Sequence, residues 1–328
     1  MKQFDIPVAL FIFKRSEKAT LIINQIAKVA PKRIYLIGDG PRNDSEIKEV
    51  ELCRKEIEGA INWDCEIIKY YADKNRGVYE NIAGGAKWVF QREKQAIFLE
   101  DDNFPEVTFF DYCKELLEKY ESDNRVLWIC GTNYLETYNP EDSSDYVFTR
   151  LMLPCGWASW SSKFLKYYDG DLQLYSDPVL LEKVKQSYSN RTLLRQNLMS
   201  WSVEKARISR GEKPISWDFQ MAFSLRVHGL YGIAPKYNQI RNIGIDIHAT
   251  HGTGSAKNPM VKRFCEIPTH KLTFPLTDPK AVLIDSCFEK KTEKIIILPL
   301  KVRIKSFIGQ AINRLLGKPI DNKLRRKK

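Results

Sequence analysis

Three consecutive carboxylates, Glu100, Asp101 and Asp102, follow directly after the apolar run at residues 96–99 (AIFL). A run of this kind predicts a buried strand, and the carboxyl ends of parallel strands are where α/β folds bind ligands. Three adjacent carboxylates repel one another unless a cation or hydrogen-bond donors compensate their charge. A divalent ion bridging them to a diphosphate would do so, because Mg²⁺ and Mn²⁺ prefer oxygen ligands and substrate phosphates. The alternative is a solvated acidic turn.

A second carboxylate, Asp218, opens a predicted helix at residues 218–227, within the sequence SWDFQ. A structural interpretation makes it the N-cap of that helix. A functional interpretation makes it a general base that takes a proton from an acceptor hydroxyl. The spacing by itself favours the structural interpretation.

Two of the four histidines, His248 and His251, lie in a glycine-bearing segment at residues 247–254. A histidine beside three carboxylates would complete a Mn²⁺ site, although the segment could equally be a loop without a ligand.

Gly156 and Trp157 belong to the sequence CGWASW, where an aromatic face could contact a sugar. Large aromatic residues more often fill a core, so both interpretations remain open there.

The elements around these residues predict an α/β fold. The continuous apolar run at 7–13 predicts a buried strand, further strands are predicted at 33–37, 65–71 and 96–99, and helical patterns separate them. Such alternation predicts a mostly parallel sheet with helices on both faces. Further helices are expected at 109–121, 178–210 and 218–227, with strands at 126–130 and 146–149. We expect one domain at 1–255 with halves at 1–103 and 104–255, whereas residues 256–295 give no clear pattern.

The charge is concentrated at the end of the chain. Of the formal net charge of +11, residues 301–328 carry +9, from ten basic residues and one acid, which leaves +2 for the rest. A nearly neutral body offers no basic groove for a nucleic-acid backbone, so nucleic-acid binding is not expected. Apolar residues of 300–316 share one helical face among lysines and arginines, which predicts a basic tail at 296–328 that lies on an anionic membrane. The alternative is a helix docked on the body.

The seven cysteines are scattered and form no CxxC pair, which favours buried free thiols in a reducing compartment. No stretch of eighteen apolar residues exists, so we expect no membrane span. Together with the basic tail, this predicts a cytoplasmic protein associated peripherally with the inner face of the cell membrane.

Taken in order, these motifs resemble those of the GT-A glycosyltransferases, within them the N-acetylglucosaminyltransferase I-like group and its bacterial relatives of capsule or O-antigen type. The resemblance spans roughly residues 6–255. The motifs are a strand ending in Phe13-Lys14-Arg15-Ser16, a turn with Asp39, a helix with Val78-Tyr79 and Lys87-Trp88, then LEDDN, FFDYC, GW with a second Trp, WD, RNIG and a His-Gly loop.

The resemblance implies a GT-A fold and a metal-dependent inverting hexosyltransferase (EC 2.4). It would use a nucleotide-sugar donor, favouring UDP, and a glycan or lipid-linked glycan acceptor in cell-surface polysaccharide synthesis. The resemblance implies that Arg15 and Asp39 contact the nucleotide base and that Glu100 and Asp101 face the donor sugar and the ribose. Asp102 would bind Mn²⁺ or Mg²⁺, with His251 near the pyrophosphate. Gly156 and Trp157 would form the wall between donor and acceptor, and Asp218 would be the general base.

Two alternatives share much of this pattern. A sugar-phosphate nucleotidyltransferase uses a related sheet and a metal, but it normally has a glycine-rich basic loop after the first strand. Here that position reads Lys14-Arg15-Ser16-Glu17-Lys18, without glycine. A catalytically inactive relative that binds carbohydrate or nucleotide without turnover would keep the same motifs.

Overall fold

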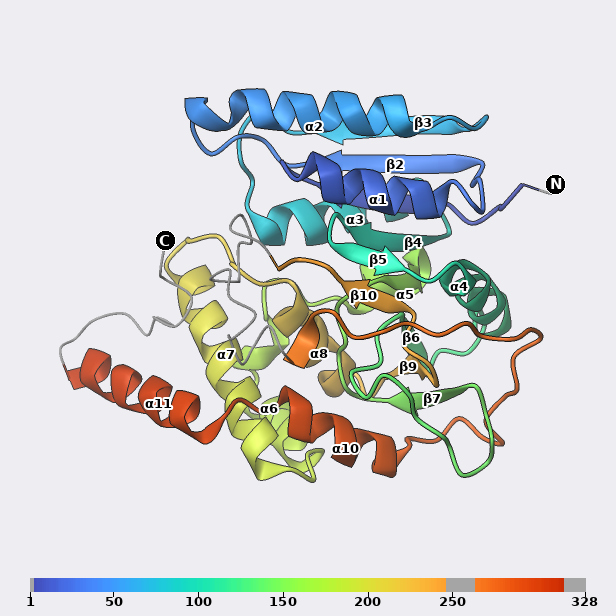
Figure 1. Ribbon diagram of the computed structural model, residues 1–328. Helices are drawn as coiled ribbons and strands as arrows, with labels where there is room; N and C mark the ends of the chain where they lie inside the picture. Colours follow the sequence, from blue (N-terminus) through green and yellow to red (C-terminus); the bar gives the residue numbers. More distant parts are fainter. Residues whose placement is uncertain (1–2, 246–262, 316–328) are drawn as a thin grey trace.

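The computed structural model describes residues 3–245 and 263–315 (Figure 1). The predicted metal ligand His251, and His248 beside it, lie outside the described residues.

The centre of the molecule is one sheet in which six of the eight strands point the same way, with the order β3-β2-β1-β4-β8-β6-β9-β7. Its strands are β1 Val8–Ile12, β2 Arg33–Gly38, β3 Glu66–Tyr71, β4 Gln95–Glu100, β6 Val126–Cys130, β7 Tyr146–Thr149, β8 Trp157–Trp160 and β9 Tyr231–Pro235. Strand β8 runs antiparallel between β4 and β6, and β7 runs antiparallel to β9 at the edge. The predicted mostly parallel sheet is confirmed.

A separate two-stranded ribbon stands beside the end of β4. It pairs β5 (Asn103–Pro105) with β10 (Ile240–Asn242) in antiparallel register, so that Asn103 lies opposite Asn242. The ribbon therefore joins the residue after the acidic triplet to a segment more than a hundred residues later in the chain.

Helices cover both faces of the sheet, as predicted (Figure 1). They are α1 Ser16–Ile26, α2 Ile47–Ala60, α3 Gly85–Phe90, α4 Thr108–Lys119, α5 Ser161–Tyr167, α6 Pro178–Gln186, α7 Arg191–Ser209, α8 Asp218–Val227, α10 Ser286–Ile296 and α11 Leu300–Leu315. The single helical stretch expected at 178–210 is two helices. Asn190 begins the second one, because its side chain accepts hydrogen bonds from the backbone N–H groups of Thr192 and Leu193.

Alternation along the strands divides the interior into two cores. In β1, Ala9 and Phe11 point into a core covered by α3, α5–α8 and α10. Val8, Leu10 and Ile12 point into a core covered by α1, α2 and α4. Burial on both faces explains why β1 reads as a continuous apolar run.

Residues 263–296 belong to the same body, although their sequence gave no clear pattern. Leu272 and Leu276 are buried in one core and Phe288 of α10 in the other. All seven cysteines are free thiols, with Cys53, Cys113 and Cys130 buried. Within the described residues, no helix is long and apolar enough to cross a membrane.

Candidate active site

The acidic triplet meets an arginine at the carboxyl edge of the sheet. Glu100 ends β4, and Arg15 follows the neighbouring parallel strand β1. The guanidinium of Arg15 donates from Nη2 to Asp101 and also to Oδ2 of Asp102, at 3.0 Å for the latter. The structure therefore places one positive charge directly on two of the three carboxylates.

Burial and mutual repulsion shift the acidities in this cluster. The pKa of Glu100 is raised well above its usual value, mainly by burial and then by the charges of Asp102 and Asp101. Burial also raises the pKa of Asp101 to about 6, although Arg15 opposes that rise. The pKa of Arg15 is raised as well, because the attraction of Asp101 and Asp102 outweighs the opposite effect of its own burial. The cluster would gain from further positive charge.

Two asparagines hold the carboxylate of Asp102. Its Oδ1 accepts a hydrogen bond from Asn103 Nδ2 at 2.7 Å, with Asn242 Nδ2 at the longer distance of 3.5 Å. Asn103 is buried, and its Oδ1 accepts from the backbone N–H of Gly156 at 2.9 Å. The ribbon of β5 and β10 thereby fixes both the carboxylate and the start of β8. Asn103 and Asn242 stand inside the LEDDN and RNIG motifs, but the sequence assigned neither a role.

Gly244 leaves room for the same carboxylate. A Cβ at this position would lie only 2.6 Å from Asp102 Oδ2. We therefore expect Gly244→Ala to displace Asp102. If the chain binds a nucleotide through a metal ion, as the sequence predicts, the variant should bind it about tenfold or more weakly, since a shift of this kind removes about one good contact. Calorimetric titration would measure it. Gly59→Ala is the matched control, because a Cβ there meets nothing within 4 Å; equal binding in both variants would contradict the expectation.

Asp218 is the first residue of α8, and its charge acts on the acidic triplet. Its charge contributes to the raised pKa of Glu100 and to that of Tyr134. Ser216 caps the helix instead of Asp218, because Ser216 Oγ accepts from Phe219 N at 3.1 Å and donates to Asp218 Oδ1. The interpretation of Asp218 as an N-cap carboxylate is therefore wrong. Among the described residues, Ser216 is the one hydrogen-bond partner of this half-buried carboxylate.

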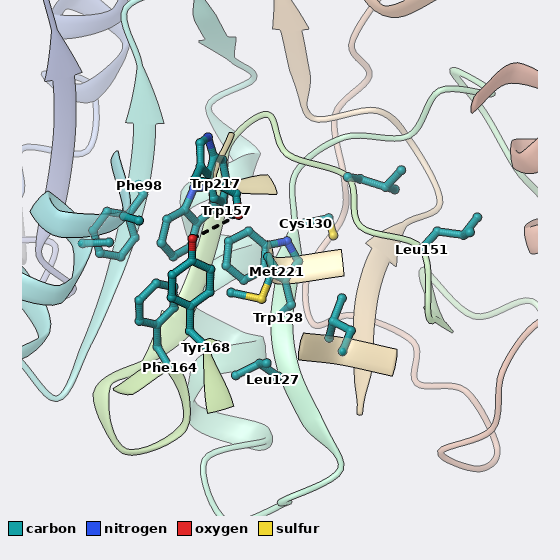
Figure 2. Packing of buried hydrophobic residues seen from close by; sticks show 14 of the residues in the cluster. Phe98, Leu127, Trp128, Cys130, Leu151, Trp157, Phe164, Tyr168, Trp217 and Met221 are labelled. Atoms are coloured by element: carbon teal, nitrogen blue, oxygen red, sulfur yellow. Dashed lines mark hydrogen bonds between the residues drawn. The ribbon is translucent and has the colours of Figure 1, made fainter. Parts of the chain in front are cut away.

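Gly156 and Trp157 have different environments in the structure. Gly156 has a φ of +61°, and a Cβ there would lie 2.5 Å from Ile240, so only glycine fits at this approach to the ribbon. The side chain of Trp157 is 1% exposed and is stacked between Phe98 and Trp128, at centroid distances of 4.0 and 4.1 Å (Figure 2). The predicted donor–acceptor wall can include Gly156 but not this indole, which belongs to the core.

Asp39 organises a loop. Its two carboxylate oxygens accept from the backbone N–H groups of Gly40, Arg76 and Gly77 and from Asn75 Nδ2, at 2.6 to 3.1 Å. A carboxylate has about four acceptor positions, so all of them are in use. The predicted contact between Asp39 and a nucleotide base would have to displace one of these donors.

The side chains around Asp102 fit one particular kind of metal site. The described residues contain no group of three or more His, Cys, Asp or Glu side chains arranged to hold an ion. Asp102 has a side chain that is 16% exposed, next to two carboxylates with raised pKa values. Mg²⁺ is commonly bound by one or two carboxylates together with substrate phosphates and water. These residues fit an ion held mainly by its substrate, and the predicted ligand His251 stays a prediction.

No family model and no curated protein matches this chain. Among solved structures it is similar to the mannosyltransferase PcManGT from Pyrobaculum calidifontis, in complex with GDP-Man and Mn²⁺, with 10% identity, a TM-score of 0.37, and coverage of 70% of this chain and 71% of that one. Mouse xyloside xylosyltransferase 1 has 10% identity, a TM-score of 0.37 and coverage of 69% and 81%. A UDP-glucose pyrophosphorylase complexed with UDP-glucose has 9% identity, a TM-score of 0.36 and coverage of 73% and 93%.

Proposed function

We propose that this protein is a metal-dependent inverting glycosyltransferase of GT-A fold. It would transfer a sugar from a nucleotide-sugar, with a UDP-sugar favoured, to a glycan or lipid-linked glycan acceptor in cell-surface polysaccharide synthesis. The observation that supports this most is the cluster of three carboxylates at the carboxyl edge of the sheet, together with a fourth carboxylate whose charge acts on it. The three lie at the end of β4 and directly after it, beside Arg15, which follows β1, and the fourth is Asp218 at the start of α8.

The acidic triplet is suited to the donor. Asp102 would hold Mn²⁺ or Mg²⁺ on the diphosphate, and the ion would stabilise the negative charge of the departing nucleotide diphosphate. Glu100 and Asp101 would accept hydrogen bonds from hydroxyls of the donor sugar and ribose. Arg15, already paired with Asp101 and Asp102, keeps these carboxylates oriented before the donor arrives.

Asp218 is suited to the acceptor. Ser216 occupies Oδ1, which leaves Oδ2 to accept the proton of the acceptor hydroxyl. As that proton moves to Asp218, the hydroxyl oxygen forms its bond to the anomeric carbon, and the bond between this carbon and the diphosphate oxygen breaks. A single displacement of this kind inverts the anomeric configuration. Asp218 is returned to its charged form when the proton leaves to water.

The nucleotidyltransferase alternative has less support from the loop after β1. That reaction needs basic groups available to a triphosphate, yet Lys14 Nζ pairs with Glu46 and Glu49, both at 3.0 Å. Arg15 is paired with the triplet, and Lys18 Nζ donates to the carbonyl of Ile243 at 2.6 Å. Each of these cations would have to give up a described partner.

The test is the thermal stability of the purified protein with UDP, GDP, CDP or TDP, and with the corresponding triphosphates, each with and without Mn²⁺. A ligand at 100 times its dissociation constant stabilises by about 2.7 kcal/mol, which raises the melting temperature by several degrees. We expect one diphosphate to give such a rise only when Mn²⁺ is present. A rise with a triphosphate alone, and pyrophosphate release when a sugar phosphate is added, would replace the proposal by the nucleotidyltransferase alternative. No rise in melting temperature with any nucleotide would contradict both the glycosyltransferase proposal and the nucleotidyltransferase alternative.

A further inference from the structure

Helix α11, the last described element, presents an apolar stripe to solvent. Leu300, Ile304 and Ile308 stand four residues apart, and these residues are 61%, 49% and 52% exposed. Residues at this spacing lie along one face of a helix. Figure 1 shows α11 extending away from the rest of the molecule at the lower left. The stripe is therefore a continuous apolar surface outside the core.

The body closes just before α11 begins. Ile296 and Ile297 pack against the core that contains Phe288. The backbone N–H of Leu298 donates to Gln196 Oε1 at 2.8 Å, and Arg263 Nη2 donates to the carbonyl of Ile297 at 2.7 Å. Residues 296–298 thus belong to the body, and the tail predicted at 296–328 starts at about Leu300. The stripe lies beyond the last residue that the core uses.

Positive charge accompanies the stripe. Lys301 and Lys305 are exposed and each directly follows a stripe residue. Residues 300–320 contain no acid, and 301–328 hold ten basic residues and only Asp321 as an acid. An acid-free basic helix with an apolar face has the composition of helices that lie in a membrane interface. Anionic lipid supplies both the apolar layer and the negative charge that this helix lacks.

We infer that α11 docks flat on an anionic lipid surface. Leu300, Ile304 and Ile308 enter the boundary of the acyl chains, while Lys301 and Lys305 lie among the lipid phosphates. The helix rests on the membrane instead of crossing it, because none of the described helices is long and apolar enough to cross. This inference stands on α11 alone and does not depend on the proposed transferase activity.

Sedimentation of the full-length protein with lipid vesicles tests whether α11 docks on an anionic surface. The vesicles consist of phosphatidylcholine alone or of phosphatidylcholine mixed with phosphatidylglycerol. Wild type is expected to bind the mixed vesicles, to bind the neutral ones weakly, and to be released by high salt. Lys301→Gln with Lys305→Gln should weaken binding to mixed vesicles by about 30-fold, since each basic side chain near such a surface contributes about fivefold. Leu300→Ser, Ile304→Ser and Ile308→Ser together should weaken it by at least as much.

Matched controls remove the same groups from the body. Lys48→Gln with Lys55→Gln deletes two exposed lysines of α2, and Leu165→Ser, Val179→Ser and Leu283→Ser together replace three exposed apolar side chains. Both controls should bind like wild type, and the α11 variants should melt at the wild-type temperature. Equal losses in controls and α11 variants would overturn the inference, as would wild-type binding by the α11 variants. The inference would also be overturned if the serine variant bound vesicles like wild type but lost a dimer that wild type forms, because a second copy would then cover the stripe.

Discussion

Asp218→Asn should lower sugar transfer by about 10²–10⁴-fold and leave binding of the donor close to wild type. Asparagine has the same shape but cannot take up the proton of an acceptor hydroxyl. The structure gives a reason to expect intact folding, since an amide oxygen can still accept from Ser216, and Ser216 itself caps α8. The loss should therefore appear in the chemical step.

The measurement is single-turnover release of the nucleotide diphosphate from nucleotide-sugars that carry the nucleotide identified by thermal stability. Binding of that diphosphate with Mn²⁺ is titrated in parallel. Asp64→Asn is the matched control, because Asp64 is an exposed acid just before the amino end of β3, whereas the acidic triplet lies at the carboxyl end of the parallel strand β4. Transfer at the wild-type rate by Asp218→Asn would remove Asp218 from the role of base. Equal losses of binding and transfer would instead show that Asp218 shapes the donor site.

The buried strands could be predicted from the sequence, and the reason is local. Strand β1 was expected at 7–13 and is Val8–Ile12, and β4 was expected at 96–99 and is Gln95–Glu100. Both strands are buried on two faces, so their central residues are all apolar and the sequence shows a continuous apolar run. Because β1 and β4 are parallel neighbours, their ends meet, which brings Arg15 to the acidic triplet.

The ribbon beside the triplet could not be predicted, since each of its strands has only three residues. Such short strands show no periodicity and form only when the partner is in place. Asn103 shows the same limit: it binds Gly156, which lies 53 residues later. In the sequence, the one signal for Asn103 is an amide side chain directly after the carboxylate motif; its burial, which requires hydrogen-bond partners, appears only in the structure.

Trp157 and Asp39 show where residue type misleads. An aromatic residue can contact a sugar or fill a core, and its neighbours along the chain do not distinguish the two. Here Phe98 and Trp128, from two other strands, enclose the indole. Asp39 stands at a strand end, where ligand contact is common, but the loop at residues 75–77 uses its acceptor positions. Both outcomes depend on distant segments.

Asp102→Asn should abolish the metal-dependent part of nucleotide binding without destabilising the free protein. The carboxylate is the proposed ligand of the divalent ion, so its loss should remove the rise of several degrees, worth about 2.7 kcal/mol, that diphosphate and Mn²⁺ give together. The free protein should melt at or above the wild-type temperature, because Asp102 contributes to the repulsion that raises the pKa of Glu100. A site that binds a cation keeps charges together at a cost to the free protein.

Melting curves with and without diphosphate and Mn²⁺ separate these two effects. Asp111→Asn is the matched control, because Asp111 is an exposed acid on α4, away from the triplet; it should keep the full metal-dependent rise. A full rise in Asp102→Asn would place the ion elsewhere. A lower melting temperature of the free variant would mean that the hydrogen bond to Asn103 and the ion pair with Arg15 stabilise the fold more than the repulsion among the carboxylates destabilises it.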